Sequence, residues 1–114
     1  MNKNIKIFLN NKQIFADVSL QESFLKRFLG LMFQLKPKDR KILIFKNAFW
    51  IHSIFCFFKF DAVFLDDNFR VIAYKSNIPP FLILKPVFGA KYVLEIVNMC
   101  LDVKIGDKIV IDEH

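Results

Sequence analysis

At 114 residues the chain is long enough to build one domain with its own hydrophobic core, which we expect to span residues 1–114. Apolar residues make up 54% of it, including 15 phenylalanines, and this composition excludes an intrinsically disordered chain. The net charge of +6 permits binding to nucleic acid or to an acidic membrane surface. However, the basic residues are scattered and no nucleic-acid-binding motif accompanies them, so a nucleic-acid partner is not expected.

The apolar runs and the cysteines indicate where the protein resides. No apolar run approaches the ~18 residues of a membrane-spanning helix, and the run Ile7–Leu9 is too short for the core of a signal peptide. Cys56 and Cys100 lie in apolar surroundings without CxxC spacing, which indicates buried thiols in a reducing compartment, with a single disulfide as the alternative. We therefore expect a cytoplasmic protein with no membrane span.

Two strands and a helix are predicted for the first third of the chain. Ile5–Leu9 and Gln13–Val18 read as strands, joined at Asn10-Asn11, a pair that tolerates positive φ and suits a tight hairpin turn. Ser19–Glu22 has the sequence of a helix capping box, and apolar residues at four-residue spacing follow it. The pattern predicts the main helix at about residues 20–29.

The middle of the chain is predicted to hold the central strands. Lys41–Lys46 is apolar on both faces and is expected inside a sheet rather than at its edge. The stretch Phe49–Asp67 contains the only tryptophan and reads as two buried strands that cross the middle of the domain. Within it, Phe60–Leu65 is the clearest strand, and a turn at Asp66–Asn68 leads to an antiparallel partner at Arg70–Lys75.

Turn residues divide the last third of the chain. Residues 77–86 contain three prolines among apolar residues, which favours an edge or loop segment. A strand is predicted at Tyr92–Val97, one helical turn at Asn98–Lys104, and a final strand at Lys108–Asp112 after a turn at Gly106-Asp107.

The fold class follows from this order of elements. About eight strands with short connections and no βαβ alternation predict a mostly antiparallel sheet. We expect an α+β fold, with a strongly curved sheet or partial β-barrel that the main helix closes on one side.

Short motifs occur along the chain in a recognisable order. They are Arg27–Met32, Leu43–Phe45, Phe49–His52 with Phe60–Asp66, and Tyr92–Glu95 with Gly106-Asp107. Their order and spacing resemble the bacterial and archaeal family called domain of unknown function 192, over nearly the whole chain. The resemblance implies a compact, mostly β domain and supplies no reaction, because the family has no established one.

The chain departs from the family pattern at three places. Lys41 stands where family members usually have glycine, Val97-Asn98-Met99 replaces the usual Pro-Ala-Gly, and the segment from Glu95 to Gly106 is shorter than usual. These departures make the local structure near Cys100 differ from the family pattern, and they leave the expected fold unchanged.

Four residues are candidates for binding a ligand: Arg27, Trp50, His52 and Asp61. Trp50 and His52 share one side of their predicted strand, so they would stack on and hydrogen-bond a ligand if that side faces a cleft, or pack if it faces the core. Asp61 has apolar neighbours on both faces and is expected to be buried. Its carboxylate then needs partners, either the Arg27 guanidinium or backbone amides between His52 and Phe58.

Metal and cofactor chemistry is not expected. Metal sites usually need three or more ligands, and the only histidine besides His52 is His114. Cys56 lies between two phenylalanines and is expected to be a buried thiol rather than a nucleophile. No serine nucleophile elbow, P-loop or dinucleotide-binding motif is present.

Two functions of different classes remain. The sequence favours a binding module for an unknown small molecule or peptide at an apolar groove near Trp50 and His52. The alternative is an enzyme of unknown reaction that uses Asp61 or Glu95 with His52 and Arg27. An enzyme would bring these polar side chains together in a pocket and perturb their pKa values.

Overall fold

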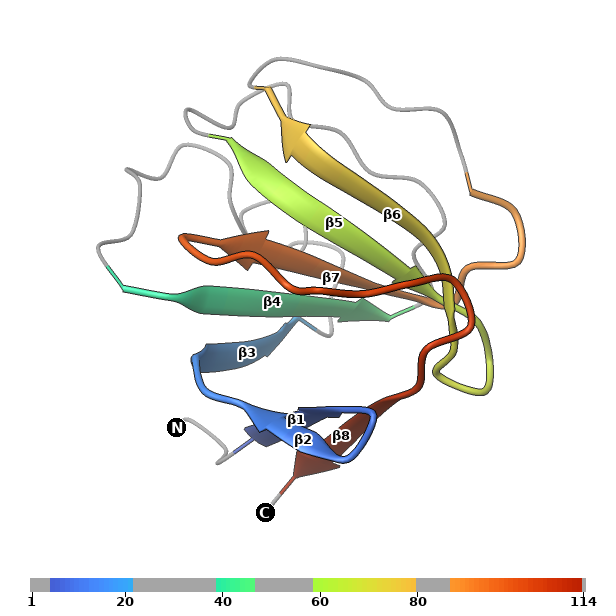
Figure 1. Ribbon diagram of the computed structural model, residues 1–114, viewed down its shortest axis with the longest axis horizontal. Coiled ribbons are helices and arrows are strands. Elements are labelled where there is room, and N and C mark those ends of the chain that lie inside the picture. The colour runs from blue at the N-terminus through green and yellow to red at the C-terminus, as the bar shows by residue number, and fades with distance from the viewer. Residues whose placement is uncertain (1–4, 22–38, 47–58, 80–86, 114) are drawn as a thin grey trace.

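Eight strands in two sheets make up the part of the chain that the structure, a computed structural model, describes: residues 5–21, 39–46, 59–79 and 87–113 (Figure 1). The strands are β1 (Ile5–Leu9), β2 (Lys12–Ile14), β3 (Asp17–Gln21), β4 (Lys41–Lys46), β5 (Phe60–Leu65), β6 (Val71–Ile78), β7 (Tyr92–Val97) and β8 (Ile109–Glu113). These residues contain no helix, and so none that is long and apolar enough to cross a membrane.

The two sheets differ in size. The large sheet has the strand order β3-β4-β7-β5-β6, and the small sheet has the order β2-β1-β8. Among the described strands every pairing is antiparallel except that of β3 with β4. Figure 1 shows the small sheet below the large one. The first and last strands of the chain therefore meet in the small sheet, and the intervening strands build the large one.

The predicted α+β class is wrong for the described residues, which form an all-β fold. Ser19 and Leu20, the expected start of the main helix, lie in β3, and β3 pairs in parallel with β4 from Asp17↔Lys41 to Gln21↔Phe45. Val18 and Leu20 also pack against the core between the sheets. A capping box is only a local preference, and strand pairing with burial outweighs it. Residues 22–29 of the predicted helix lie outside the described part.

Three further expectations need correction. Two open sheets replace the single strongly curved sheet or partial barrel. The strand predicted at Gln13–Val18 is broken at Phe15 and Ala16, because here the chain passes from the small sheet to the large one. Asn98–Lys104 is irregular and forms no helical turn.

Other predictions are confirmed. Asn10 and Asn11 have φ values of 48° and 70°, as a tight hairpin between β1 and β2 requires. β4 is interior, and β5 and β7 have the predicted bounds. The Gly106-Asp107 turn is present, and Gly106 has a φ of 96°.

Both faces of the large sheet are buried. One face packs on the small sheet and forms the inter-sheet core; its fully buried members include Ile7, Ile42, Ile44, Val63, Leu65, Leu94, Ile96 and Ile109. The opposite face carries the outer core, which includes Leu43, Phe45, Phe60, Ala62, Phe64, Val93 and Val97. Successive residues of a strand alternate between these faces. The alternation expected for β5, with Asp61 sharing a face with Val63 and Leu65, is confirmed.

Candidate functional site

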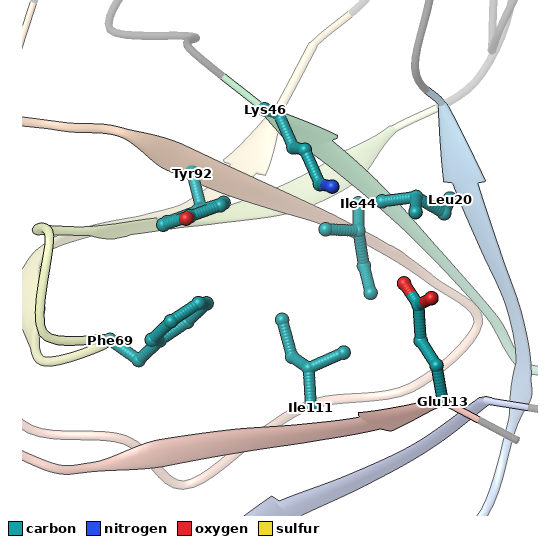
Figure 2. A pocket seen from close by; sticks show the side chains of 7 residues that line it. All are labelled: Leu20, Ile44, Lys46, Phe69, Tyr92, Ile111 and Glu113. Carbon is teal, nitrogen blue, oxygen red and sulfur yellow. The ribbon is translucent and has the colours of Figure 1, made fainter.

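A pocket opens between the two sheets at one edge of the inter-sheet core (Figure 2). Its volume is about 330 Å³. The described residues that line this inter-sheet pocket are Leu20, Ile44, Lys46, Phe69, Tyr92, Ile111 and Glu113. They come from β3, β4, β7, β8 and the turn between β5 and β6, so both sheets contribute to its walls.

Two aromatic rings form one end of the pocket. The rings of Phe69 and Tyr92 are stacked, with centroids 4.4 Å apart and planes inclined by 20°. Phe69 lies in the β5–β6 turn with a φ of 60°, a conformation that costs energy for a bulky residue. The local structure imposes this conformation, because the Oδ1 atom of Asp66 accepts hydrogen bonds from the backbone N–H groups of Asn68 (2.9 Å) and Arg70 (3.0 Å). The turn therefore holds the aromatic wall in place.

Backbone hydrogen bonds attach this turn to the small sheet. Ile109, the first residue of β8, donates its N–H to the carbonyl of Phe69 at 2.9 Å. Val71, the first residue of β6, accepts a hydrogen bond from Gly106 N–H and donates its own N–H to the carbonyl of Asp107, both at 2.8 Å. The aromatic end of the pocket is thus joined to β8, which supplies the opposite wall.

Lys46 and Glu113 give the pocket one positive and one negative charge. Lys46 ends β4 and pairs in register with Tyr92, so both side chains share the pocket face of the large sheet. Glu113 ends β8. Figure 2 shows the two charged side chains extending toward the pocket from opposite sides, with Ile44 between them and Ile111 beside Glu113. Lys46 and Glu113 are exposed, and each also has an interaction within the protein.

Asp61 is buried as predicted, with only 6% of its surface exposed. Its Oδ2 atom accepts a hydrogen bond from the Tyr74 hydroxyl at 2.9 Å, and its Oδ1 atom accepts one from the backbone N–H of Asn77 at 2.8 Å. Asn77 has a φ of 52°, and the β5–β6 register shifts between Phe60 and Ala62. Asp61 therefore stabilises an irregular point in the pairing of these strands. Burial, followed by the hydrogen bond to Asp61, raises the pKa of Tyr74 to about 12.

These partners differ from those expected from the sequence. Tyr74 and Asn77 both belong to β6. Arg27 and the backbone between His52 and Phe58, which we expected to supply the partners, lie outside the described residues.

Asp61 lies well away from the inter-sheet pocket. It pairs with Ile96, whereas the pocket residue Tyr92 pairs with Leu65, four residues further along β5. At about 3.3 Å per residue, this places Asp61 about 13 Å from that end of the strand. Asp61 does not line the pocket. The role predicted for it in ligand binding near Trp50 and His52 stays a prediction.

Glu95 faces the outer core, on the other side of the large sheet. It lies opposite Leu43 on β4 and Ala62 on β5, and 6% of its surface is exposed. No hydrogen bond or ion pair joins its carboxyl to any other residue that the structure describes. Burial raises the pKa of Glu95 to about 8, so the carboxyl is mostly protonated at neutral pH. Because Asp61 pairs with Ile96 and Ala62 with Glu95, Asp61 and Glu95 occupy opposite faces.

Other candidate residues are only partly placed. Arg27, Trp50 and His52 lie outside the described residues, as does Cys56. Cys100 is a free, exposed thiol, so its predicted burial is wrong: it lies in the irregular segment after β7. Within the described ranges no group of three or more His, Cys, Asp or Glu side chains is arranged to hold a metal ion.

Sequence reasoning missed the residues of the inter-sheet pocket. One signal was available, because period-two alternation in β4 puts Lys46 on the same face as Ile44. No comparable signal connects Lys46 to Glu113, which lies on a distant strand of the other sheet.

Comparisons with known proteins identify the family. The model of the family domain of unknown function 192, described as "Uncharacterized ACR", matches residues 6–111. The chain is 38% identical over 85 residues to the UPF0127 protein PH1112 of Pyrococcus horikoshii, covering 70% of this chain and 71% of that protein. It is 34% identical over 109 residues to the UPF0127 protein PF1050 of Pyrococcus furiosus, covering 86% of this chain and 89% of that protein.

Two crystal structures are similar in fold. A protein of unknown function from Novosphingobium aromaticivorans aligns with a TM-score of 0.75 and 20% identity, over 93% of this chain and 82% of that one. A candidate transcription regulator from Sinorhizobium meliloti aligns with a TM-score of 0.69 and 20% identity, over 95% and 92%. At this identity the likeness establishes the fold alone. The match to the family model over residues 6–111 establishes more: the chain belongs to the uncharacterised family domain of unknown function 192.

Proposed function

We propose that the protein is a binding module for a small molecule, which it holds in the inter-sheet pocket. The observation that carries this proposal is the composition of the pocket: an apolar and aromatic lining with a few polar groups at the rim. Its volume of about 330 Å³ lies at the lower end of the range of about 300–1,000 Å³ that is typical of ligand sites. The size suits a small ligand better than a folded partner.

The groove predicted near Trp50 and His52 stays a separate proposal, because Asp61, one of its candidate residues, does not line the inter-sheet pocket. There Arg27, Trp50, His52 and Asp61 remain candidate contacts for a small molecule or peptide. We also propose a cytoplasmic location. The exposed free thiol of Cys100 supports it, because exposed thiols persist in reducing compartments.

An enzyme is the weaker proposal for the described residues. Asp61 and Glu95 face opposite sides of the large sheet, so no single site uses both. The Asp61 carboxyl is already bonded to two donors. The raised pKa of Glu95 is the observation that favours catalysis, because perturbed acids are frequent in active sites. A catalytic site would therefore be built around Glu95 on the outer face.

A pair of variants on β8 tests binding in the pocket. Ile111 lines the pocket and is half-buried, whereas Val110, its neighbour on the same strand, is 40% exposed. Ile111→Phe fills the pocket, and Val110→Phe adds the same ring outside it. Amide chemical shifts recorded during titration with a small-molecule library report binding, and circular dichroism confirms that both variants fold.

The proposal predicts that a ligand shifts the amides of pocket residues in wild type and Val110→Phe and that Ile111→Phe weakens this binding at least tenfold. If no compound perturbs the pocket residues, or if Ile111→Phe binds as tightly as wild type, the pocket is not the binding site.

A further inference from the structure

We propose that the ligand of the inter-sheet pocket is a free α-amino acid with an apolar or aromatic side chain. This inference rests on the proposed binding function and adds the chemical class of the ligand. It is carried by the charges of the lining and by the arrangement of the apolar groups around them.

The charges favour a ligand that carries both signs. Lys46 extends toward the pocket from the large sheet and Glu113 from the small sheet, so the described part of the lining carries one charge of each sign (Figure 2). An anionic ligand would place its charge next to the Glu113 carboxylate, and a cationic ligand would place its charge next to the Lys46 ammonium. Juxtaposed like charges disfavour both. A zwitterion avoids this conflict, because its carboxylate pairs with Lys46 and its ammonium with Glu113.

Lys46 and Glu113 each already make an interaction within the protein, so a ligand has to replace that interaction or add to it. A zwitterion carries a carboxylate, which accepts hydrogen bonds from Lys46, and an ammonium, which donates them to Glu113. Each side chain therefore keeps a partner of opposite charge when the ligand replaces or joins its existing contact. A ligand with a single charge offers this exchange to only one of the two side chains.

The rest of the pocket favours an apolar side chain. Ile44 lies between the charged groups, Ile111 lies beside Glu113 on the side of Phe69, and the stacked rings of Phe69 and Tyr92 form the aromatic end. An amino-acid side chain directed along this surface would be removed from water, which is favourable in proportion to the apolar area buried.

The size of the pocket favours a single amino acid over a peptide. In a single residue the ammonium and the carboxylate are attached to the same carbon atom, so both charges fit in a site of about 330 Å³ together with the side chain. A longer peptide separates its two termini and has to leave the pocket.

Four probes that share one ring test the inference. Isothermal titration and amide shifts are measured with L-phenylalanine, with N-acetyl-L-phenylalanine, which lacks the ammonium, with L-phenylalaninamide, which lacks the carboxylate, and with propylbenzene, which lacks both. We expect L-phenylalanine to bind at least tenfold more tightly than each of the other three, since a charge-assisted hydrogen bond commonly contributes this much.

Two variants assign the charges. Lys46→Gln removes the partner of the ligand carboxylate, so it is expected to abolish the preference for L-phenylalanine over L-phenylalaninamide. Glu113→Gln removes the partner of the ligand ammonium, so it is expected to abolish the preference for L-phenylalanine over N-acetyl-L-phenylalanine. Lys12→Gln and Asp102→Asn remove exposed charges that do not line the pocket, and both preferences are expected to persist in them.

The outcomes separate this inference from the proposed function. If propylbenzene binds in the pocket as tightly as L-phenylalanine, the pocket is a binding site but its ligand is not an amino acid. If L-phenylalanine binds and neither Lys46→Gln nor Glu113→Gln changes the preference among probes, the assignment of the charges is wrong and the inference is overturned. If none of the four probes and no library compound perturbs the pocket residues, both proposals fail.

Discussion

Replacing Glu95 by glutamine should make the protein more stable at neutral pH. The side chain is buried among apolar neighbours, and its pKa is raised from an ordinary 4.5 to about 8 in the folded state. The folded state therefore binds the proton more tightly than the unfolded state does. The resulting stabilisation is complete below about pH 4.5 and is lost as the pH rises through 8.

The size of the effect follows from the two pKa values. Each pH unit between the unfolded and the folded pKa changes the unfolding free energy by about 1.4 kcal/mol. The titration of Glu95 therefore lowers the unfolding free energy of the wild-type protein by about 3 kcal/mol between pH 4 and pH 7. Glutamine has nearly the shape of the protonated acid and does not titrate, so Glu95→Gln lacks this loss. The stability of the variant relative to wild type should thus rise by about 3 kcal/mol over that range.

Urea unfolding of both proteins between pH 4 and pH 8 measures this difference. Any other group that titrates in the range affects both proteins and cancels. Glu95→Leu is the matched control, because leucine also has no titrating group but makes different contacts. The stability difference between Glu95→Leu and wild type should depend on pH as the difference between Glu95→Gln and wild type does, with a constant offset. A difference between wild type and Glu95→Gln that stays constant with pH would show that Glu95 is not held in a protonated state.

Three other substitutions test local features. Tyr74→Phe should cost about 1–3 kcal/mol in urea unfolding, because the buried Asp61 carboxyl loses a donor, and a loss below about 0.5 kcal/mol would contradict this. Phe69→Gly should be more stable than Phe69→Ala by about 1 kcal/mol in thermal unfolding, because glycine adopts a φ of 60° without strain; the reverse order would refute the turn geometry. Gly106→Ala should cost about 1 kcal/mol by the same measurement, from its φ of 96° rather than from a clash, because no described residue other than its two chain neighbours has a heavy atom within 4 Å of the added methyl group; an unchanged melting temperature would contradict this.

Much of the large sheet was predictable from the sequence because its signals are local. Phe60–Leu65 and Tyr92–Val97 have the predicted bounds, since continuous apolar runs of this length are typical of strands buried on both faces. The burial of Asp61 followed from alternation alone. The turn at Asn10 and Asn11 was predictable because few other residues adopt positive φ at low cost.

The errors arose where distant contacts decide the structure. Ser19 is in a strand because it pairs with Leu43. Local sequence patterns do not predict a parallel partner that lies more than twenty residues away. The inter-sheet pocket has the same origin. Alternation places Lys46 on the pocket face of β4, but Ile111 and Glu113 reach the pocket only because β8 joins the small sheet. Local sequence patterns do not determine which sheets pack together.

The central claim is that the inter-sheet pocket binds a small molecule, and titration of isotopically labelled protein with the small-molecule library, L-phenylalanine included, tests it most directly. The account predicts that the amides of Tyr92 and Ile111 shift in a saturable way in wild type and in Val110→Phe. In Ile111→Phe the same shifts should require at least tenfold more ligand. Shifts that are equal in all three proteins, or confined to residues outside the pocket, would contradict it.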